Sequence, residues 1–481
     1  MRAFVQRKAA PAGGPASGPG AARAPHAAVP VVTYVLWVVM ADGTVPTPVY
    51  SLYAQRLHLS PPVVALVFAA YAVGIVAALL VFGGLSDRIG RRATLAPALA
   101  VAALSGAVFM TCENLPGLFA GRLLCGVSVG LTTGAATAYL GELHPDRPRA
   151  ALIASVTNMA GLGSGSLLSG VLVAYAPSPT VLPYAVVTAL LLPGLALAVL
   201  PETVAARKGR VRPQRLSVPP AARAPFAAAA VAVFASFALL GLLASLSGNF
   251  LVQGLHNHSH LAVGLVVFSA FGAAGAAQLF AVRLPPRTGL TAGMAGVPLG
   301  LALIVTGLST TSLAVFLCGS LVGGAGAGTS FKSGLALVTA HAAPGRVSEL
   351  VSSYFVAAYL GLTLPVIGVA VLLANGTLMT AACVFAGVVT VLCLAASPSP
   401  RPAPVPRPRE DSTMTTAPDR TLPAPGGPCA LTTVDPDGFR ALMASHPGGV
   451  AVVTTTDGLG TAAVRPARLC DVAVGLTGHI S

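Results

Sequence analysis

The sequence predicts an all-α, polytopic membrane protein with about twelve transmembrane helices in two six-helix bundles. The 481 residues are 55% hydrophobic and only 9% charged, with a mean hydropathy of +0.81, whereas soluble domains carry roughly 25% charged residues. The apolar residues form runs of about 18 or more, long enough to cross a bilayer. Positive charge is concentrated in the short segments between these runs, as is typical of loops retained on the cytoplasmic side.

The apolar runs divide into two halves. Residues 1–28 are rich in Ala, Gly and Pro and are predicted to be a disordered cytoplasmic tail. No cleaved signal peptide is expected, because the first apolar run is too long for one. The first bundle is predicted over residues 29–200, a basic cytoplasmic linker over 201–225, and the second bundle over 226–397. The predicted spans lie near 29–53, 61–84, 93–111, 116–140, 150–175 and 181–200, then near 226–252, 261–282, 289–308, 312–337, 351–374 and 377–397.

The charge distribution predicts the orientation of these spans. Fourteen basic residues fall in loops of one side, whereas the loops of the other side hold only Arg56. Because short loops rich in Arg and Lys stay in the cytoplasm, both termini are predicted to be cytoplasmic and the location to be the cell membrane. The fourteen residues are Arg88, Arg91, Arg92, Arg147, Arg149, Arg207, Lys208, Arg210, Arg212, Arg215, Arg223, Arg283, Arg287 and Arg346.

Composition also indicates which partners to expect. The net charge of +14 comes from basic residues in interhelical loops rather than from a phosphate-binding face, so no nucleic-acid partner is expected. The seven cysteines show no CxxC or metal-ligand spacing, and neither a cofactor nor a metal is predicted. His256, His258 and His260 alternate in an outer loop. Such short loops are more often solvated than metal-binding.

One loop carries a specific motif. Residues 83–92 read Gly-Gly-Leu-Ser-Asp-Arg-Ile-Gly-Arg-Arg and follow the second span. This stretch resembles the hallmark loop of the major facilitator superfamily at every position. Three further stretches are similar to motifs of that family: Leu118–Gly126 in the fourth span with Arg122 followed by Gly126, Glu142–Pro145 after it, and Pro201–Thr203 after the sixth span. The resemblance, which covers residues 29–397, implies a secondary transporter that works by alternating access.

The loop is expected to act as a gate. Asp87 is placed to face the start of the eleventh span, near Ser348–Ser352, where the helix dipole favours a carboxylate by about 0.3–1 kcal/mol. Such a contact forms in one arrangement of the two halves only, and so biases alternating access. The alternative is a pure topology signal, for which the arginines alone would suffice. The predicted gating residues are Gly83, Asp87, Arg88, Gly90, Arg91 and Arg92.

Asp42 is the only acid inside a predicted span. An ionisable group at membrane depth costs at least ~2.5 kcal/mol and usually marks an ion path or a substrate site. The stretch Ala41–Pro48 resembles the first-span motif of drug/proton antiporters, which implies that Asp42 carries a proton. The alternative is that Asp42 satisfies backbone groups freed by Pro46 and Pro48.

Arg122 is the only charge within the fourth span and is the predicted partner of Asp42 or of the substrate. The resemblance implies a part in proton transfer. The alternative is a purely structural polar anchor. Asn158, on a span rich in small residues, and Lys332 are candidates for the substrate cavity. For Lys332, near the cytoplasmic end of its span, we favour snorkelling to the surface.

The tail, residues 398–481, begins with a Pro- and Arg-rich linker and contains a second resemblance. Phe439–Met443 and Gly448–Thr455 resemble the opening helix and strand of flavin reductase-like FMN-binding barrels. The match covers only 435–460, too short to build a barrel. It therefore indicates a truncated fragment without a working flavin site.

The sequence thus favours a monomeric, proton-driven exporter of a small organic molecule, embedded in the lipid bilayer. Asp42 is predicted to carry the proton and Arg122 to tune it. The alternatives are an uptake symporter for a sugar or metabolite and a membrane-anchored flavin oxidoreductase, for which twelve spans are more than an anchor needs.

Overall fold

The computed structural model describes residues 28–204, 223–341, 347–396, 451–456 and 462–467. Twelve helical segments are long and apolar enough to cross a membrane, which confirms the predicted all-α class. The spans are α1 (Ala28–Asp42) with α2 (Pro46–Arg56), α3 (Pro61–Phe82), α5 (Arg91–Thr111), α6 (Leu115–Leu143), α7 (Arg147–Tyr175), α8 (Leu182–Leu190) with the 3₁₀-helix η1 (Leu192–Val199), α9 (Arg223–Asn249) with the π-helix η3 (Phe250–Gly254), α10 (His260–Ala281), α11 (Pro286–Ser309), α12 (Leu313–Ala340), α13 (Val347–Asn375) and α14 (Leu378–Ala396). The short helix α4 (Ser86–Ile89) joins α3 to α5.

Polar residues at the ends of the apolar runs explain where several helices begin. The side chain of Asn114 accepts a hydrogen bond from the Gly117 amide at 2.8 Å, and that of Asp146 accepts one from the Arg149 amide at 3.0 Å. Ser259 and Ser312 cap α10 and α12 in the same way. These side chains satisfy amide groups that the first turn of a helix leaves without an intrahelical partner.

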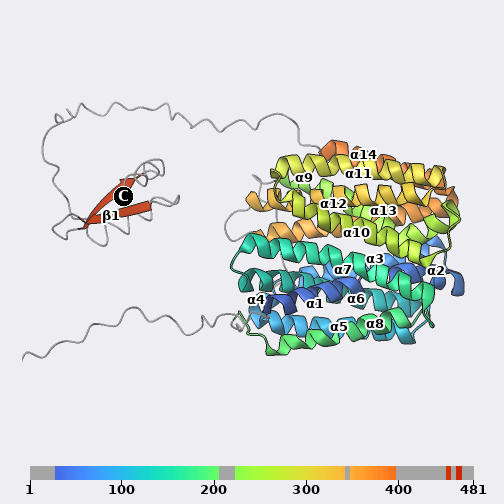
Figure 1. Ribbon diagram of the computed structural model, residues 1–481, viewed down its shortest axis with the longest axis horizontal. Helices are drawn as coiled ribbons and strands as arrows, with labels where there is room; N and C mark the ends of the chain where they lie inside the picture. Colours follow the sequence, from blue (N-terminus) through green and yellow to red (C-terminus); the bar gives the residue numbers. More distant parts are fainter. Residues whose placement is uncertain (1–27, 205–222, 342–346, 397–450, 457–461, 468–481) are drawn as a thin grey trace, which may run out of the picture. The chain divides into compact units, whose positions relative to one another are not determined.

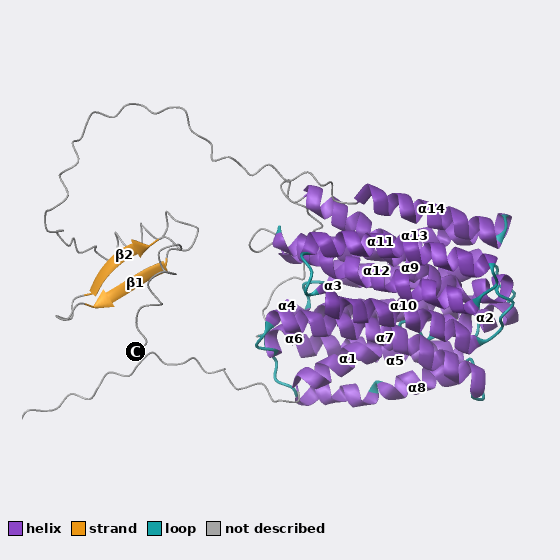
Figure 2. Ribbon diagram, turned by 45° about the horizontal axis from the view of Figure 1, so that its top comes forward, coloured by secondary structure: helices purple, strands orange, loops and turns teal. Residues whose placement is uncertain are grey.

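The first span is not one continuous helix. It is interrupted at Gly43–Val45, so Asp42 is the last residue of α1 and Pro46 the first of α2 (Figure 2). Proline lacks an amide hydrogen, and Pro46 therefore cannot donate to a carbonyl of the preceding turn. Polar side chains lie at the break. The Thr44 hydroxyl donates to the Leu162 carbonyl on α7 at 2.6 Å.

The spans form one helical unit in which each half of the sequence stays together (Figure 1). Within the first half, α3 and α6 cross at Gly74 and Gly126. A Cβ at Gly74 would collide with the Leu123 carbonyl, and one at Gly126 would collide with the Tyr71 carbonyl. Close backbone approach at small residues is a usual way in which membrane helices associate, because lipid supplies no hydrophobic driving force between them.

Further glycine contacts explain why the predicted fifth span is rich in small residues. Gly161 and Gly165 on α7 lie against the backbone of α1 near Met40 and Ala41. In the second half, Gly361 on α13 contacts Phe234 on α9 in an equivalent manner. Both halves are therefore held by the same kind of contact.

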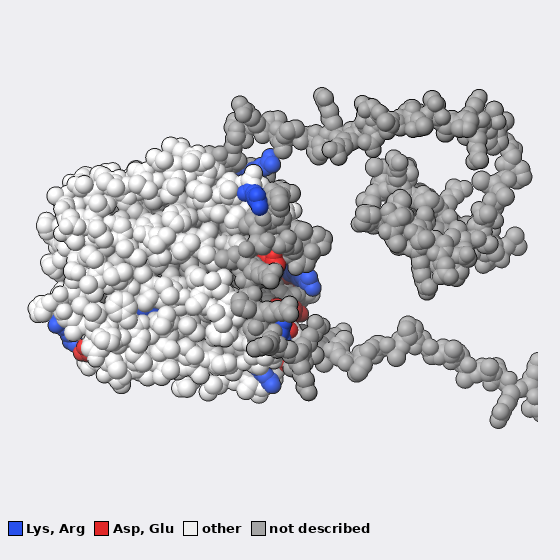
Figure 3. Space-filling model, turned by 180° about the vertical axis from the view of Figure 1, so that it is seen from behind, with Lys and Arg blue, Asp and Glu red and all other residues white. Residues whose placement is uncertain are grey.

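Basic side chains gather at one end of the bundle, and the sides carry almost no charge (Figure 3). We call this end the basic end. It is formed by the α3–α5, α6–α7 and α10–α11 junctions and by the start of α9. Arg56 lies at the opposite end, where it pairs with Glu113 at 3.2 Å. Among the described residues the basic side chains of this end are Arg88, Arg91, Arg92, Arg147, Arg149, Arg223, Arg283 and Arg287.

The C-terminal unit contains one described element, a β-hairpin. β1 (Ala451–Thr456) pairs antiparallel with β2 (Ala462–Ala467), and Val453 lies opposite Arg465. β1 coincides with the strand expected within Gly448–Thr455. The expected helix at Phe439–Met443 lies outside the described residues. So do residues 1–27, 205–222 and 397–450 of the tails and linker, together with Arg346.

We predict opposite effects of two Gly→Ala substitutions on α6. Gly126→Ala places a methyl group against the Tyr71 carbonyl, and overpacking of this kind costs about 1–3 kcal/mol. Gly141→Ala meets no atom within 4 Å, and alanine is favoured over glycine in a helix by about 0.5–1 kcal/mol. Thermal unfolding of the purified protein should therefore show a lower melting temperature for Gly126→Ala and an unchanged or higher one for Gly141→Ala. Equal melting temperatures would contradict the proposed crossing of α3 and α6.

Candidate functional site

A cavity of about 490 Å³ lies between the two halves of the helical unit. The first half borders it with α1, α3, α6 and α7, and the second half with α9, α10, α12 and α13. Since both halves contribute walls, any movement of one half relative to the other changes the shape of this cavity.

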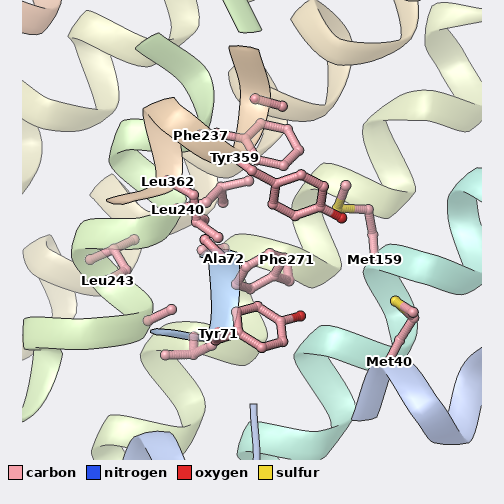
Figure 4. Close-up of a cluster of buried hydrophobic side chains, with 14 of the residues drawn as sticks. Met40, Tyr71, Ala72, Met159, Phe237, Leu240, Leu243, Phe271, Tyr359 and Leu362 are labelled. Carbon is pink, nitrogen blue, oxygen red and sulfur yellow. The ribbon is translucent and has the colours of Figure 1, made fainter. Parts of the chain in front are cut away.

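The cavity wall is mainly aromatic and aliphatic. Figure 4 shows part of it, with the hydroxyl groups of Tyr71 and Tyr359 on the side of Met40 and Met159. Aromatic rings from the second half pack on one another: Phe331 lies 5.6 Å from Phe237 and 5.9 Å from Phe355 between ring centroids. Among the residues that border the cavity, charge occurs only at Asp87 and Arg91, near the basic end. Such a wall accommodates an uncharged molecule with apolar or aromatic groups.

The cavity extends toward the basic end and is closed at the opposite end. Gly83, Asp87 and Arg91 border it on the basic side. At the opposite end, hydrogen bonds join the two halves. The Thr47 hydroxyl donates to the Ala244 carbonyl at 2.9 Å, and the Ser51 hydroxyl lies 3.2 Å from Nδ1 of His260. The two halves are therefore in contact at the end opposite the basic end.

Arg91 is the centre of the hallmark loop. Its guanidinium pairs with Asp87 at 2.6 Å and with Glu142 on α6 at 2.6 Å, and it also donates to the Ser86 hydroxyl at 2.6 Å. The Arg91 side chain is only 8% exposed, whereas that of Asp87 is 62% exposed. Sequence reasoning placed Glu142 in a loop, but α6 continues to Leu143 and holds its carboxylate beside Arg91.

A second carboxylate fixes the same loop from the end of the sixth span. Glu202 accepts hydrogen bonds from the backbone amides of Arg91 and Arg92 at 2.7 and 3.0 Å. Gly90 has a φ of 107°, and a Cβ there would collide with the Glu202 carboxylate. Gly90 is thus required twice, for a backbone conformation that L-residues rarely adopt and for the approach of Glu202.

The predicted contact between Asp87 and the start of the eleventh span takes a different form. The Asp87 carboxylate is paired with Arg91, while Asp87 and Ser352 of α13 border the same cavity. The side chain of Ser348 lies outside the described residues. Gly83 borders the cavity as well, and Arg88 lies in the same turn on α4.

Asp42 and Arg122 come together in a buried polar cluster at the break in the first span. Asp42 is 5% exposed and Arg122 is fully buried. Nη1 of Arg122 donates to the Gly43 carbonyl at 2.9 Å, so the arginine holds the backbone next to Asp42 rather than its carboxylate. Cys125, one turn further along α6 from Arg122, is also buried.

Three aromatic rings surround the Arg122 guanidinium. Its central carbon lies 4.5 Å from the ring centroid of Tyr71, 5.4 Å from that of Phe68 and 5.7 Å from that of Tyr50. A cation over an aromatic face gains about 2 kcal/mol or more where water is excluded. The rings therefore compensate part of the cost of burying a permanent charge.

The cluster retains polar atoms without a partner. In the described part of the chain, Oδ2 of Asp42, the Tyr50 hydroxyl, and Nε and Nη2 of Arg122 are buried and make no hydrogen bond. Buried polar atoms are normally paired, because leaving one unpaired costs about 1–3 kcal/mol. Other unpaired buried side-chain atoms in the described part of the chain lie outside this cluster, on Thr132, Ser166, Ser245, Ser247, Gln278 and Ser330.

The remaining candidates occupy different surroundings. Asn158 borders the cavity, and its amide lies 3.1 Å from Sδ of Met40. Lys332 lies on α12 but is not among the residues bordering the cavity. His258 and His260 border a small pocket at the opposite end, and no group of three potential metal ligands occurs among the described residues.

Sequence reasoning missed the aromatic components of the site. Tyr71, Phe237, Phe331 and Tyr359 each occur singly within apolar runs, where an aromatic residue is more often plain core or lipid contact. Nothing in the local sequence separates them from aromatic residues outside the cavity, such as Phe109.

Comparison with known proteins agrees with this geometry. The family model described as Major Facilitator Superfamily matches residues 32–364. A crystal structure of the nucleoside transporter NupG, a single-site mutant, is similar in fold, with a TM-score of 0.59. It shares 14% sequence identity, and the match covers 76% of this chain and 98% of that chain.

We predict that Arg91→Gln lowers stability more than Arg149→Gln does. Loss of the Arg91 charge removes two ion pairs and leaves Glu142, which is 30% exposed, without its cation, at a cost of about 1–3 kcal/mol. The Arg149–Asp146 pair is a matched surface pair whose arginine is 76% exposed, and such pairs contribute about 0–1 kcal/mol. Melting temperatures of the two purified variants test the ranking, and equal losses would contradict it.

Proposed function

This chain belongs to the Major Facilitator Superfamily and is a membrane-embedded secondary transporter rather than an enzyme, and we propose that it exports a small organic molecule in exchange for protons. The observation that carries this proposal is the cavity between the two halves, which extends to the basic end while interhalf hydrogen bonds close the opposite end. Reversing that asymmetry would move a bound molecule from one side of the membrane to the other.

The proposed substrate is uncharged and carries apolar or aromatic groups. The middle of the cavity offers the faces of Phe237, Phe271 and Phe331 but no charged side chain. A charged molecule would lose its hydration there without gaining a counter-charge, which is costly. The polar side chains of Thr44 and Asn158 are available to orient a substrate by hydrogen bonds.

The proposed proton carrier is Asp42, and Arg122 tunes it. Asp42 is buried next to the carbonyl to which the buried Arg122 cation donates. An ionisable group at membrane depth usually marks an ion path or a substrate site. The break at Gly43–Val45 supports this role, because irregular backbone at membrane depth occurs where it lines a cavity or is buried in protein.

The hallmark loop is proposed to be the gate of the basic end. Gly83, Asp87 and Arg91 border the cavity on this side, and Glu142 and Glu202 attach the loop to α6 and to the end of the sixth span. Closure toward α13 would require the exposed Asp87 carboxylate to exchange its partner. We propose that the basic end faces the cytoplasm, that the membrane is the cell membrane, and that the transporter acts as a monomer.

Uptake in symport with protons is the alternative direction, and the same site geometry serves both. The direction in which a pH gradient drives flux decides between them. Nucleosides belong in the substrate panel, since the similar structure is a nucleoside transporter.

We predict that Asp42→Asn abolishes transport driven by a pH gradient. A panel of uncharged aromatic compounds is first screened for those that raise the melting temperature, because a ligand at 100 times its Kd adds about 2.7 kcal/mol of stability. In proteoliposomes the gradient-driven transport rate of the variant should be lower than that of the wild type by a factor of about ten or more, which corresponds to about 1.4 kcal/mol. It should still equilibrate the compound without a pH gradient.

Glu113→Gln, at an exposed acid of the opposite end, is the matched control. Undiminished gradient-driven transport by Asp42→Asn would refute the coupling role.

We predict that Asp87→Asn slows transport without preventing membrane insertion. The amide keeps the size of the side chain but lacks the charge that pairs with Arg91 and that a helix N-terminus would attract. Transport should fall severalfold in both directions, while the expression level and the melting temperature stay near those of the wild type. Asp146→Asn, at the start of α7, provides the control for loss of a surface carboxylate. A wild-type rate in Asp87→Asn would remove the gating role.

A further inference from the structure

Tyr71 belongs to the cavity wall and to the buried polar cluster at once. Its side chain borders the cavity, and its ring is the closest of the three that contact Arg122, at 4.5 Å. Asp42, Arg122, Tyr50 and Cys125 are not among the residues that border the cavity. A molecule in the cavity therefore meets Tyr71, Phe68 and Gly43 before it meets any of these groups, and of the two rings that of Tyr71 lies nearer to Arg122.

Gly43 also lies between the cavity and the buried polar cluster. Its carbonyl accepts the hydrogen bond from Arg122, and a Cβ at this position would lie 2.8 Å from the Tyr71 hydroxyl oxygen. The Tyr71 hydroxyl thus rests against the backbone that follows Asp42. A displacement of the Tyr71 ring changes the packing of both the guanidinium and this backbone.

The backbone of Tyr71 is fixed by the crossing of α3 and α6. The Tyr71 carbonyl lies against Gly126, which is one helical turn from Arg122 on α6. The backbone of Tyr71 therefore has little room to shift at this crossing. This also gives the Arg122–Gly126 spacing a physical reason, because the glycine brings α3 close enough for a ring of α3 to cover the arginine.

Arg122, which the Tyr71 ring contacts, and Asp42 both have buried polar atoms without a partner. Oδ2 of Asp42 and Nε and Nη2 of Arg122 are buried without a hydrogen bond in the described part of the chain. With the ring in place they are shut off from the cavity. With the ring displaced, water from the cavity reaches them and provides the path that a proton needs.

We propose that Tyr71 is a positioning residue that couples occupancy of the cavity to proton access at Asp42. This inference rests on the proposed proton coupling. With the cavity empty, the ring covers Arg122 and keeps the proton site closed. A bound aromatic substrate displaces the ring, opens the site to the cavity and makes proton exchange depend on substrate.

The test needs no substrate and uses the full-length protein in proteoliposomes loaded with pyranine, a fluorescent pH indicator. Tyr71→Met replaces the ring by a flexible side chain and should increase proton leak under an imposed pH gradient by about tenfold, which corresponds to about 1.4 kcal/mol. Tyr71→Phe keeps the ring and should leak less than Tyr71→Met. Phe109→Met removes a buried ring of the same half that lies outside the cavity wall, and controls for general loosening.

The double variant Tyr71→Met with Asp42→Asn separates this inference from the proposed function. Loss of the leak in the double variant supports both. A leak that survives Asp42→Asn shows that the proton does not pass through Asp42 and overturns the proposed coupling together with the inference. A wild-type leak in Tyr71→Met, or an equal leak in Phe109→Met, overturns the inference alone.

Cysteine labelling gives a second measurement should Tyr71→Met insert poorly. Cys125 is 1% exposed, lies on α6 one turn from Arg122 and does not border the cavity. Gly43→Ala should push the Tyr71 hydroxyl aside and thereby increase the rate at which methyl methanethiosulfonate modifies Cys125. Mass spectrometry of the peptide that contains Cys125 measures this rate. Adding Tyr71→Phe removes the clashing oxygen and should restore protection. Equal labelling rates in the single and double variants would contradict the inference.

Discussion

A permanent positive charge buried inside the first helical bundle is the constraint on which the rest of this site depends. Arg122 has no exposed surface, and its guanidinium remains protonated in proteins. The protein compensates this charge with a carbonyl freed by the break in the first span, with three aromatic rings and with the neighbouring Asp42. The break, the rings and the acid are therefore parts of one arrangement, and changing any of them alters the electrostatic environment of the others.

Close packing at glycine makes that arrangement possible. Gly126 brings α3 against α6, and Gly161 and Gly165 bring α7 against α1, so that the helices carrying Tyr71, Arg122 and Asp42 meet. The second half repeats the packing, with Gly324 and Gly328 of α12 against Ala270 and Ala274 of α10. Within the described residues it does not repeat the buried arginine. The two halves thus share the same kind of helix packing but contribute different groups to the site. The first half holds the ionisable cluster, and the second supplies most of the aromatic cavity wall.

In the hallmark loop the charges come from a local motif, but residues distant in the sequence hold them in place. Asp87 on the short helix α4 pairs with Arg91 at the start of α5, but the position of the loop is set by Glu142 and Glu202, which lie about 50 and 110 residues further along the chain. The motif contains the charges, and the ends of the fourth and sixth spans decide where those charges are held. Because only the exposed Asp87 borders the cavity without a second anchor among the described contacts, it is the member best able to change partners.

The sequence by itself determined the fold class, the twelve spans, the basic end and the candidate pair Asp42 and Arg122. These follow from local properties: a run of apolar residues must span the bilayer, charge must lie in loops, and a rare charge inside a span must have a partner. The tertiary structure alone decided that Arg122 bonds to the Gly43 carbonyl, that Glu202 caps the hallmark loop, and that Tyr71 both borders the cavity and contacts Arg122. In an almost uniformly apolar sequence, nothing local distinguishes a ring facing lipid from a ring facing a cavity. That distinction arises only when glycines on neighbouring helices fix how the spans cross.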